Sequence, residues 1–323
     1  MAVDVPELYR ALIAQYLAWP EADEDAYRSV SVSLSGYTRL TGDDTHAAHK
    51  HIERLLSSGS GEAMDALGQH WSKVKNRDAA SIEAAAQSSA TAMAAIADHV
   101  EAAKLSVVSI AAELSLATGA GTAAGPLTFG ASQAVVTGAV AKNGPRARSV
   151  VDGCLEDAYH VLVRLQKDPS VAALEGIAAG LAAGVGGAAG GVGGGVAAGV
   201  GADRGWGVPP ETGRAIAGGV HVDHAEHQLA AGKLREVATT VLGTTAGALS
   251  QAADHHATAA ASGSLGATLA PSVNSVLDRL SKANSAFGDH LNGSLPDAVL
   301  LISTSQQATD DDNKQRMSQL NAP

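Results

Sequence analysis

The chain has 323 residues and a net charge of −11, and 46% of its residues are hydrophobic although only 3% are aromatic. Strands favour aromatic and β-branched side chains, so this alanine-rich composition predicts an all-α protein. The negative charge argues against a nucleic-acid partner. The single cysteine, Cys154, excludes an internal disulfide and a zinc site made of cysteines, and we expect it to be a small buried side chain.

The first predicted element is a short amphipathic helix over residues 4–18. Asp4 and Glu7 have the spacing of a capping box, and Pro20 is expected to end the helix. The N-terminal residues show no basic leader, no apolar stretch and no small-residue cleavage site, so we expect that they are not a Sec signal peptide. The apolar face of the helix would consist of Leu8, Leu12, Tyr16 and Trp19.

A long helix is predicted from the acidic stretch "EADEDAYRSV", which begins at residue 21, to about residue 57. Its apolar periodicity weakens at 42–44, where we expect a kink or a break. The sequence "SSGSG" at 57–61 predicts a turn. A second long helix is predicted over about 62–117.

The second long helix carries the strongest periodic pattern in the sequence. Apolar and small residues alternate at spacings of four and three over about five heptads, which indicates a seam against another long helix. The preceding helix, folded back as an antiparallel hairpin, is the expected partner. The seam consists of Ile82, Ala86, Ser89, Met93, Ile96, Val100, Ala103, Val107, Ile110 and Leu114.

The rest of the chain is expected to form further helices, separated by glycine-rich or polar stretches. Residues 115–145 are apolar and almost uncharged, and helices are predicted over 147–168 and 222–260. The sequence "SGSLG" separates the latter from another helix, and a final helix would begin at Pro296. The polar tail that follows is expected to fray.

The first third of the chain resembles a known family. A short helix ending in "WPEADEDA" (19–26), a glycine-bearing turn near Trp71, and a second long helix with "EAAKLSVVSI" (101–110) are similar to helical N-terminal domains of actinobacterial type VII secretion substrates, the Trp-X-Gly (WXG) group. That group includes N-terminal regions of polymorphic toxins and of the mycobacterial channel-forming necrotizing toxin. The resemblance covers residues 1–120, and lysine stands here where the family's glycine follows the tryptophan.

The resemblance implies export by a type VII pathway, and therefore a secreted or cell-envelope protein that is cytoplasmic before export. It also implies that Trp71 and the seam bind a small WXG-type helical partner or a second copy, and that the chain contacts the secretion machinery. The family's export signal is a tyrosine followed four residues later by an acidic residue, just after a helical hairpin. The matching positions here are Gln306, Gln307, Asp310 and Asp311.

The segment 176–202 contains no charged residue, and 12 of its 27 residues are glycine. Each glycine costs a helix about 1 kcal/mol relative to alanine, so a helix here needs close packing or a lipid environment. The four-residue spacing of the glycines indicates a glycine zipper, with 115–141 as a possible mate and conditional membrane insertion as a hypothesis. The zipper residues are Gly176, Gly180, Gly184, Gly187, Gly191, Gly195 and Gly199.

The sequence "HVDHAEH" groups imidazole and carboxylate side chains that suit zinc. We expect no metal, because a solvated helix start explains the cluster and no second ligand pair matches it. No nucleophile elbow and no phosphate-binding loop is present in the sequence, so we expect neither a cofactor nor an enzyme. The candidate ligands, should a metal bind, are His221, Asp223, His224 and His227.

Taken together, the sequence predicts a WXG-like antiparallel helical hairpin domain (1–120), a Gly/Ala-rich middle region with the zipper (121–205), and a C-terminal helical region with a polar tail (206–323). The expected function is non-enzymatic and type VII secretion-associated, through protein–protein interaction of the hairpin. A membrane channel or pore-forming toxin region is the first alternative, and a metal-dependent enzyme is the second.

Overall fold

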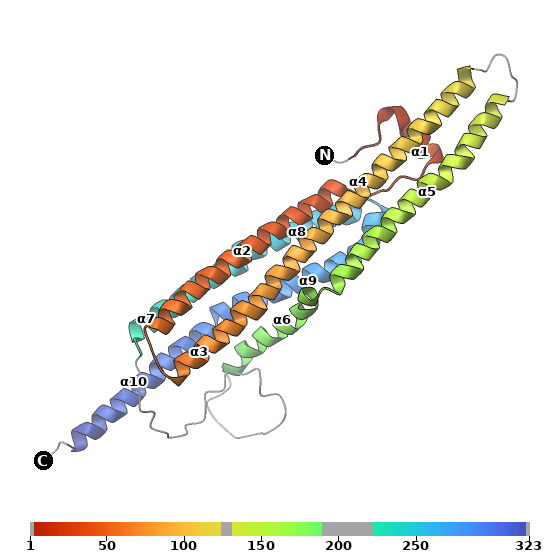
Figure 1. Cartoon of the computed structure of the whole chain (residues 1–323). Coiled ribbons are helices and arrows are strands. Elements are labelled where there is room, and N and C mark those ends of the chain that lie inside the picture. The colour runs from red at the N-terminus through yellow and green to blue at the C-terminus, as the bar shows by residue number, and fades with distance from the viewer. Residues whose placement is uncertain (1–2, 124–130, 189–221, 321–323) are drawn as a thin grey trace. The chain divides into compact units, whose positions relative to one another are not determined.

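The computed structural model describes residues 3–123, 131–188 and 222–320, and this part of the chain is helical and contains no strand (Figure 1). The prediction of an all-α protein is therefore confirmed for these residues. The elements in chain order are η1 (Glu7–Tyr9), α1 (Arg10–Tyr16), α2 (Glu24–Ser57), α3 (Glu62–Lys73), η2 (Val74–Ala79), α4 (Ala80–Ala123), α5 (Ala131–Gln166), α6 (Pro169–Ala188), α7 (His224–Thr240), η3 (Val241–Thr245), α8 (Ala246–Ala261), α9 (Ser264–Asn292) and α10 (Ser294–Leu320).

The chain forms two compact units that are interleaved along the sequence. Unit 1 consists of residues 1–35, 87–168 and 250–277, and unit 2 consists of residues 36–86, 169–249 and 278–323. The long helices α2, α4, α8 and α9 each contribute to both units. The three consecutive regions derived from the sequence remain a prediction about domain organisation.

Helix α2 is continuous, and its ends follow from local chemistry. The Asp23 carboxylate accepts a hydrogen bond of 2.9 Å from the Ala26 amide, and the first turn is acidic, as the positive end of a helix dipole favours. The break expected at 42–44 is not present, because α2 runs on through these residues. The predicted turn at 57–61 is confirmed, and Gly61 provides it with a φ of 127° that a residue with a side chain rarely adopts.

The second long helix is confirmed, with one local change. It runs from α3 into α4 through η2, a π-helical segment that the periodicity did not reveal. Every residue of the seam is buried, with exposed fractions of 6% or less. In unit 1, Glu24 and Arg28 of α2 contact Lys104 and Glu101 of α4, so the two helices run antiparallel there.

The short N-terminal helix packs on unit 1 in a way that differs from the prediction. Pro6 stands at the N-terminal end of η1, and no side chain makes a capping hydrogen bond there. The capping box of Asp4 and Glu7 therefore does not form. The expected apolar face is also wrong in part, since Leu8 is 76% exposed and Tyr16 is 36% exposed. The buried residues of α1 and its end are Ile13 and Leu17, which join a core cluster with residues of α4 and α5.

Unit 2 contains a second π-helical segment, η3, which interrupts the predicted helix 222–260 between α7 and α8. Buried polar side chains bind both of its ends. Asn284 Nδ2 donates to the Val241 carbonyl at 3.2 Å, and Tyr37 Oη donates to Asn284 Oδ1 at 3.2 Å. At the other end, Thr245 Oγ1 donates to Asp44 Oδ2 at 2.6 Å. The Val241 carbonyl also accepts a hydrogen bond from the Ala246 amide, so Asn284 adds a second donor to a carbonyl that the π-segment already uses.

Two further helices extend beyond their predicted limits. Helix α5 begins at Ala131 and runs through Pro145, although a proline inside a helix removes one hydrogen bond. Arg146 lies next to it and bonds both Glu113 of α4, at 2.7 Å, and Asn143, at 3.0 Å. Helix α10 includes the polar tail as far as Leu320.

Candidate functional site

The seam of α4 lies inside the protein. The residues predicted to bind a partner have exposed fractions of 4% or less, and so does Trp71 of α3. An external helix would have to open a unit before it reached them. The buried residues are Trp71, Ile82, Met93, Ile96, Val100, Val107, Ile110 and Leu114.

Trp71 is part of the core of unit 2. Its Nε1 atom donates a hydrogen bond of 3.1 Å to Nδ1 of His49 on α2, and the two rings are stacked with centroids 6.4 Å apart. The indole is only 2% exposed, so both its apolar body and its polar N–H are used within the chain. The pairing also shows that α2 and α3 pack against one another beside the turn in unit 2.

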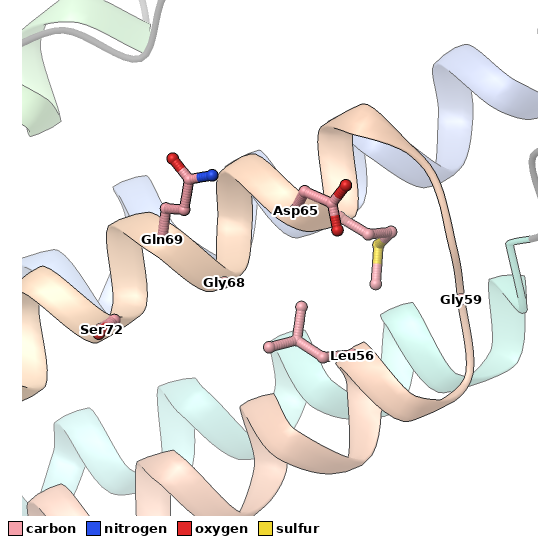
Figure 2. A pocket seen from close by; sticks show the side chains of 7 residues that line it. Leu56, Gly59, Asp65, Gly68, Gln69 and Ser72 are labelled. Carbon is pink, nitrogen blue, oxygen red and sulfur yellow. The ribbon is translucent and has the colours of Figure 1, made fainter. Parts of the chain in front are cut away.

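An open hollow of about 610 Å³ lies beside this turn. Figure 2 shows its two sides, with Leu56 at the end of α2, Gly59 in the connection, and Asp65, Gly68 and Gln69 on α3. Gly68 faces the end of the Leu56 side chain, and a Cβ at this position would lie 3.4 Å from Cδ1 of Leu56. The lining of the hollow combines apolar Leu56 and Met64 with polar Asp65, Gln69 and Ser72. The full lining is Leu56, Gly59, Met64, Asp65, Gly68, Gln69 and Ser72.

The candidate metal ligands at α7 have structural roles in unit 2. Asp223 caps α7 by accepting hydrogen bonds from the amides of Ala225 and Glu226. His224 Nδ1 lies 2.7 Å from Ser303 Oγ of α10, and His227 is buried with its Nδ1 atom 2.8 Å from the Asp223 carbonyl. His221 lies outside the described residues. Within the described ranges, no three His, Cys, Asp or Glu side chains are grouped as a metal would require.

A histidine pair that the sequence analysis missed lies in unit 2. The Nε2 atoms of His70 on α3 and His290 on α9 are 3.1 Å apart, and Ser294 Oγ lies 2.6 Å from Nδ1 of His290. Burial lowers the pKa of His290 to about 3 and that of His70 to about 4. The four-residue spacing of His290 and Ser294 was visible in the sequence, but His70 lies 220 positions away.

Unit 1 contains a buried ion pair that the sequence also did not reveal. Lys104 Nζ of α4 lies 2.6 Å from Glu24 Oε2 of α2, and the two side chains are 7% and 0% exposed. The Val3 amide donates to the other carboxylate oxygen of Glu24, and Lys104 lies over the ring of Trp19, 5.8 Å from its centroid. Burial raises the pKa of Glu24, but the hydrogen bonds from Lys104 and Val3 outweigh it and hold the pKa below its usual value.

The candidate export residues lie on the exposed end of α10. From Thr304 to Leu320 the helix has no buried residue, and Gln306 Nε2 donates to Asp310 Oδ1 at 3.0 Å. Ion pairs within the helix accompany this bond, between Asp311 and Lys314 and between Asp312 and Arg316. Side-chain pairs at these spacings stabilise an exposed helix without tertiary packing. Gln307 and Asp311 occupy the equivalent positions one residue further on.

Gly176 and Gly180 of the proposed zipper do not touch another backbone. A Cβ built at Gly176 or Gly180 would meet nothing within 4 Å. Helix α6 instead buries a face made of Val171, Leu174, Ile177 and Leu181. Gly184 and Gly187 belong to the same helix, whereas Gly191, Gly195 and Gly199 lie outside the described residues. Among the helices that the structure describes, none combines the length and the apolar character needed to span a bilayer.

Among the residues that the structure describes, the hollow at the α2–α3 turn and the exposed end of α10 are open to a partner. Both belong to unit 2. The buried histidine pair and the buried ion pair provide polar contacts inside the units. Comparison of the chain with protein-family models, with curated proteins and with solved structures found no match.

Proposed function

We propose that this protein is a non-enzymatic component of a type VII-like secretion pathway that acts through helix-mediated contacts with other proteins. Two features of the first third support the proposal. The sequence there resembles WXG-group substrates, and the same residues form long helices with a turn at 57–61. Under this proposal the protein is secreted, or attached to the cell envelope, after export from the cytoplasm.

The observation that carries the proposal is the exposed end of α10. Its helix is held by its own side-chain pairs, so it keeps a fixed shape while its surface stays open to a receptor. The Gln306–Asp310 pair lies at the spacing of the family's tyrosine and acid. In the proposed mechanism the secretion machinery binds this helix, and Asp310 and Asp311 provide the negative charge that it recognises.

The buried seam bears on how a partner binds. Because Met93, Ile96 and Val107 are already packed inside the chain, a WXG-type partner would bind to the outside of the folded helices. The hollow at the α2–α3 turn offers such a contact, with Leu56 and Met64 for apolar side chains and Asp65 and Gln69 for polar ones. An interface commonly combines an apolar centre with a polar rim in this way.

Secretion from an actinobacterial host tests the proposal. The epitope-tagged full chain is expressed in a strain with an active type VII system and in one that lacks its ATPase, and the tag is measured in culture filtrates. We expect export only in the first strain, and we expect Asp310→Ala combined with Asp311→Ala to remove most of it. Gln315→Ala combined with Met317→Ala is the matched control, at two exposed positions of the same helix outside the named side-chain pairs, and should be exported. Equal export from both strains would refute the proposal.

A further inference from the structure

The N-terminal segment, residues 3–20, lies in an apolar groove of unit 1 between α4 and α5. Ile13 and Leu17 enter the groove and form one core cluster with Val107, Ile110, Ala111 and Leu114 of α4 and Ala147 of α5. Val5, Tyr9, Leu12 and Trp19 pack around the same cluster. The groove thus binds an amphipathic helix, and in this structure the helix comes from the same chain.

The groove also recognises two polar features of the segment. The Val3 amide donates to Glu24, and the Trp19 ring lies under Lys104 at the other end of the segment. Glu24 and Lys104 belong to α2 and α4, so the ion pair stays with unit 1 if the segment leaves. A departing segment would expose the apolar cluster and remove cover from a buried charge pair, and both effects cost free energy.

The connection between the segment and α2 is short and stiff. Only residues 20–23 separate Trp19 from α2, and Pro20 has a fixed φ. The Asp23 amide donates to Ser262 Oγ at 2.9 Å, and Glu21 packs so closely on Gly263 that a Cβ at Gly263 would lie 2.3 Å from the Cβ of Glu21. Short, constrained hinges favour exchange of a terminal element between copies. In the exchanged form the hinge no longer has to turn back on its own chain, and the terminal element makes the same contacts with the other copy.

We propose that two copies of this chain exchange residues 3–20, so that each groove binds the N-terminal segment of the other copy. The occupant is a second copy because the groove requires more than an apolar helix. An amide at the position of Val3 and an indole at the position of Trp19 must accompany Ile13 and Leu17, and the same segment of another copy provides all of them. The exchange is independent of the proposed export, and purified protein is sufficient to test it.

Cross-linking of two different variants tests the exchange. Gly144 of α5 is suited to the purpose, because a Cβ there would lie 3.5 Å from the carbonyl oxygen of Tyr16. In a Cys154→Ala background, one full-length protein carries Tyr16→Cys and a differently tagged one carries Gly144→Cys. The two are unfolded together, refolded at high concentration and treated with a short bismaleimide. A chain with both cysteines is the internal reference and should cross-link within itself.

We expect the mixture to yield a covalent dimer that contains both tags, about tenfold more of it than a mixture of Tyr16→Cys with Leu116→Cys, because exchange raises the effective concentration of the first pair. Leu116 is 77% exposed on α4 and serves as the matched control for random collisions. Equal yields from the two mixtures would overturn the proposal. Failure of the doubly substituted chain to cross-link internally would also overturn it, because the segment would then not occupy the groove.

Lengthening the hinge provides a second measurement that needs no cross-linker. Insertion of two glycines between Glu21 and Ala22 relieves the constraint, so we expect a lower dimer fraction in native mass spectrometry than for the unmodified chain. The same insertion in the turn at 57–61 is the control and should leave the dimer fraction unchanged. A dimer fraction that does not respond to the hinge insertion would argue against exchange at this hinge.

Discussion

The Nε2 atoms of His70 and His290 lie 3.1 Å apart in unit 2, so one of them must carry a hydrogen and the other must accept it. If Ser294 donates to Nδ1 of His290, then His290 holds its proton on Nε2 and donates it to His70. Protonation of both rings would direct two N–H groups at each other. The pair therefore requires at least one neutral imidazole.

This geometry predicts that acid destabilises unit 2. The pKa values of both histidines are depressed in the folded protein, to about 4 and about 3, so the unfolded chain binds more protons below its own pKa near 6.5. Stability should fall as the pH drops from about 6.5 towards 4, by on the order of 3 kcal/mol for each histidine. Urea unfolding at neutral and acid pH measures this loss.

The control for the acid effect is a histidine on the surface. His290→Leu should flatten the pH dependence of the unfolding free energy over this range, whereas His46→Leu should leave it intact, since His46 is exposed on α2. An identical pH dependence in wild type and His290→Leu would assign the acid sensitivity to other groups.

Removal of one partner of the buried Glu24–Lys104 pair should cost more stability than removal of both. Lys104→Met leaves a fully buried carboxylate without its cation and should lower the unfolding free energy by about 3 to 5 kcal/mol. Glu24→Leu combined with Lys104→Met should recover most of that loss, because no uncompensated charge remains. Chemical denaturation of the two single variants and the double variant gives the coupling.

An exposed pair calibrates the effect of burial. Arg39 and Asp43 lie 3.1 Å apart at the surface of α2, and Arg39→Ala should change stability by less than about 0.5 kcal/mol. A comparable loss in Arg39→Ala and Lys104→Met would mean that burial does not determine the strength of these pairs.

Gly288 of α9 permits close packing against the π-helical segment η3. A Cβ at this position would lie 2.5 Å from Cδ2 of Leu242 and 2.6 Å from its Cγ. Gly288→Ala should therefore destabilise the protein by about 1 to 3 kcal/mol despite the better helix propensity of alanine. Thermal unfolding checks this, and adding Leu242→Ala should restore part of the loss. A gain in stability for Gly288→Ala alone would show that η3 shifts at no cost.

The glycines of α6 should respond in the opposite direction. Nothing lies within 4 Å of a Cβ at Gly176 or Gly180, so each change to alanine should stabilise the protein by about 1 kcal/mol through helix propensity. Gly232→Ala in α7, which also faces open space, is the reference for this gain. Thermal unfolding provides the comparison. A loss of stability confined to the α6 variants would reveal a partner packed on the zipper.

Local patterns in the sequence determined much of the fold. The acidic start of α2, the glycine-containing turn at 57–61 and the seam on α4 were all readable, because caps, turns and helical periodicity depend on residues within a few positions of each other. The periodicity predicts that the seam from Ile82 to Leu114 lies against another long helix, and the structure buries every member. Whether that seam also serves a partner stays a prediction.

The tertiary structure decided which distant residues meet, and the sequence carried no signal for those meetings. His70 with His290, Glu24 with Lys104, and Asp44 with Thr245 are separated by 80 to 220 positions. The tertiary structure also decided which face of the N-terminal helix is buried. Ile13 and Leu17 pack against α4 and α5, whereas Leu8 and Tyr16 are exposed. Periodicity states that a helix has a side to bury, but only packing in three dimensions decides what it is buried against.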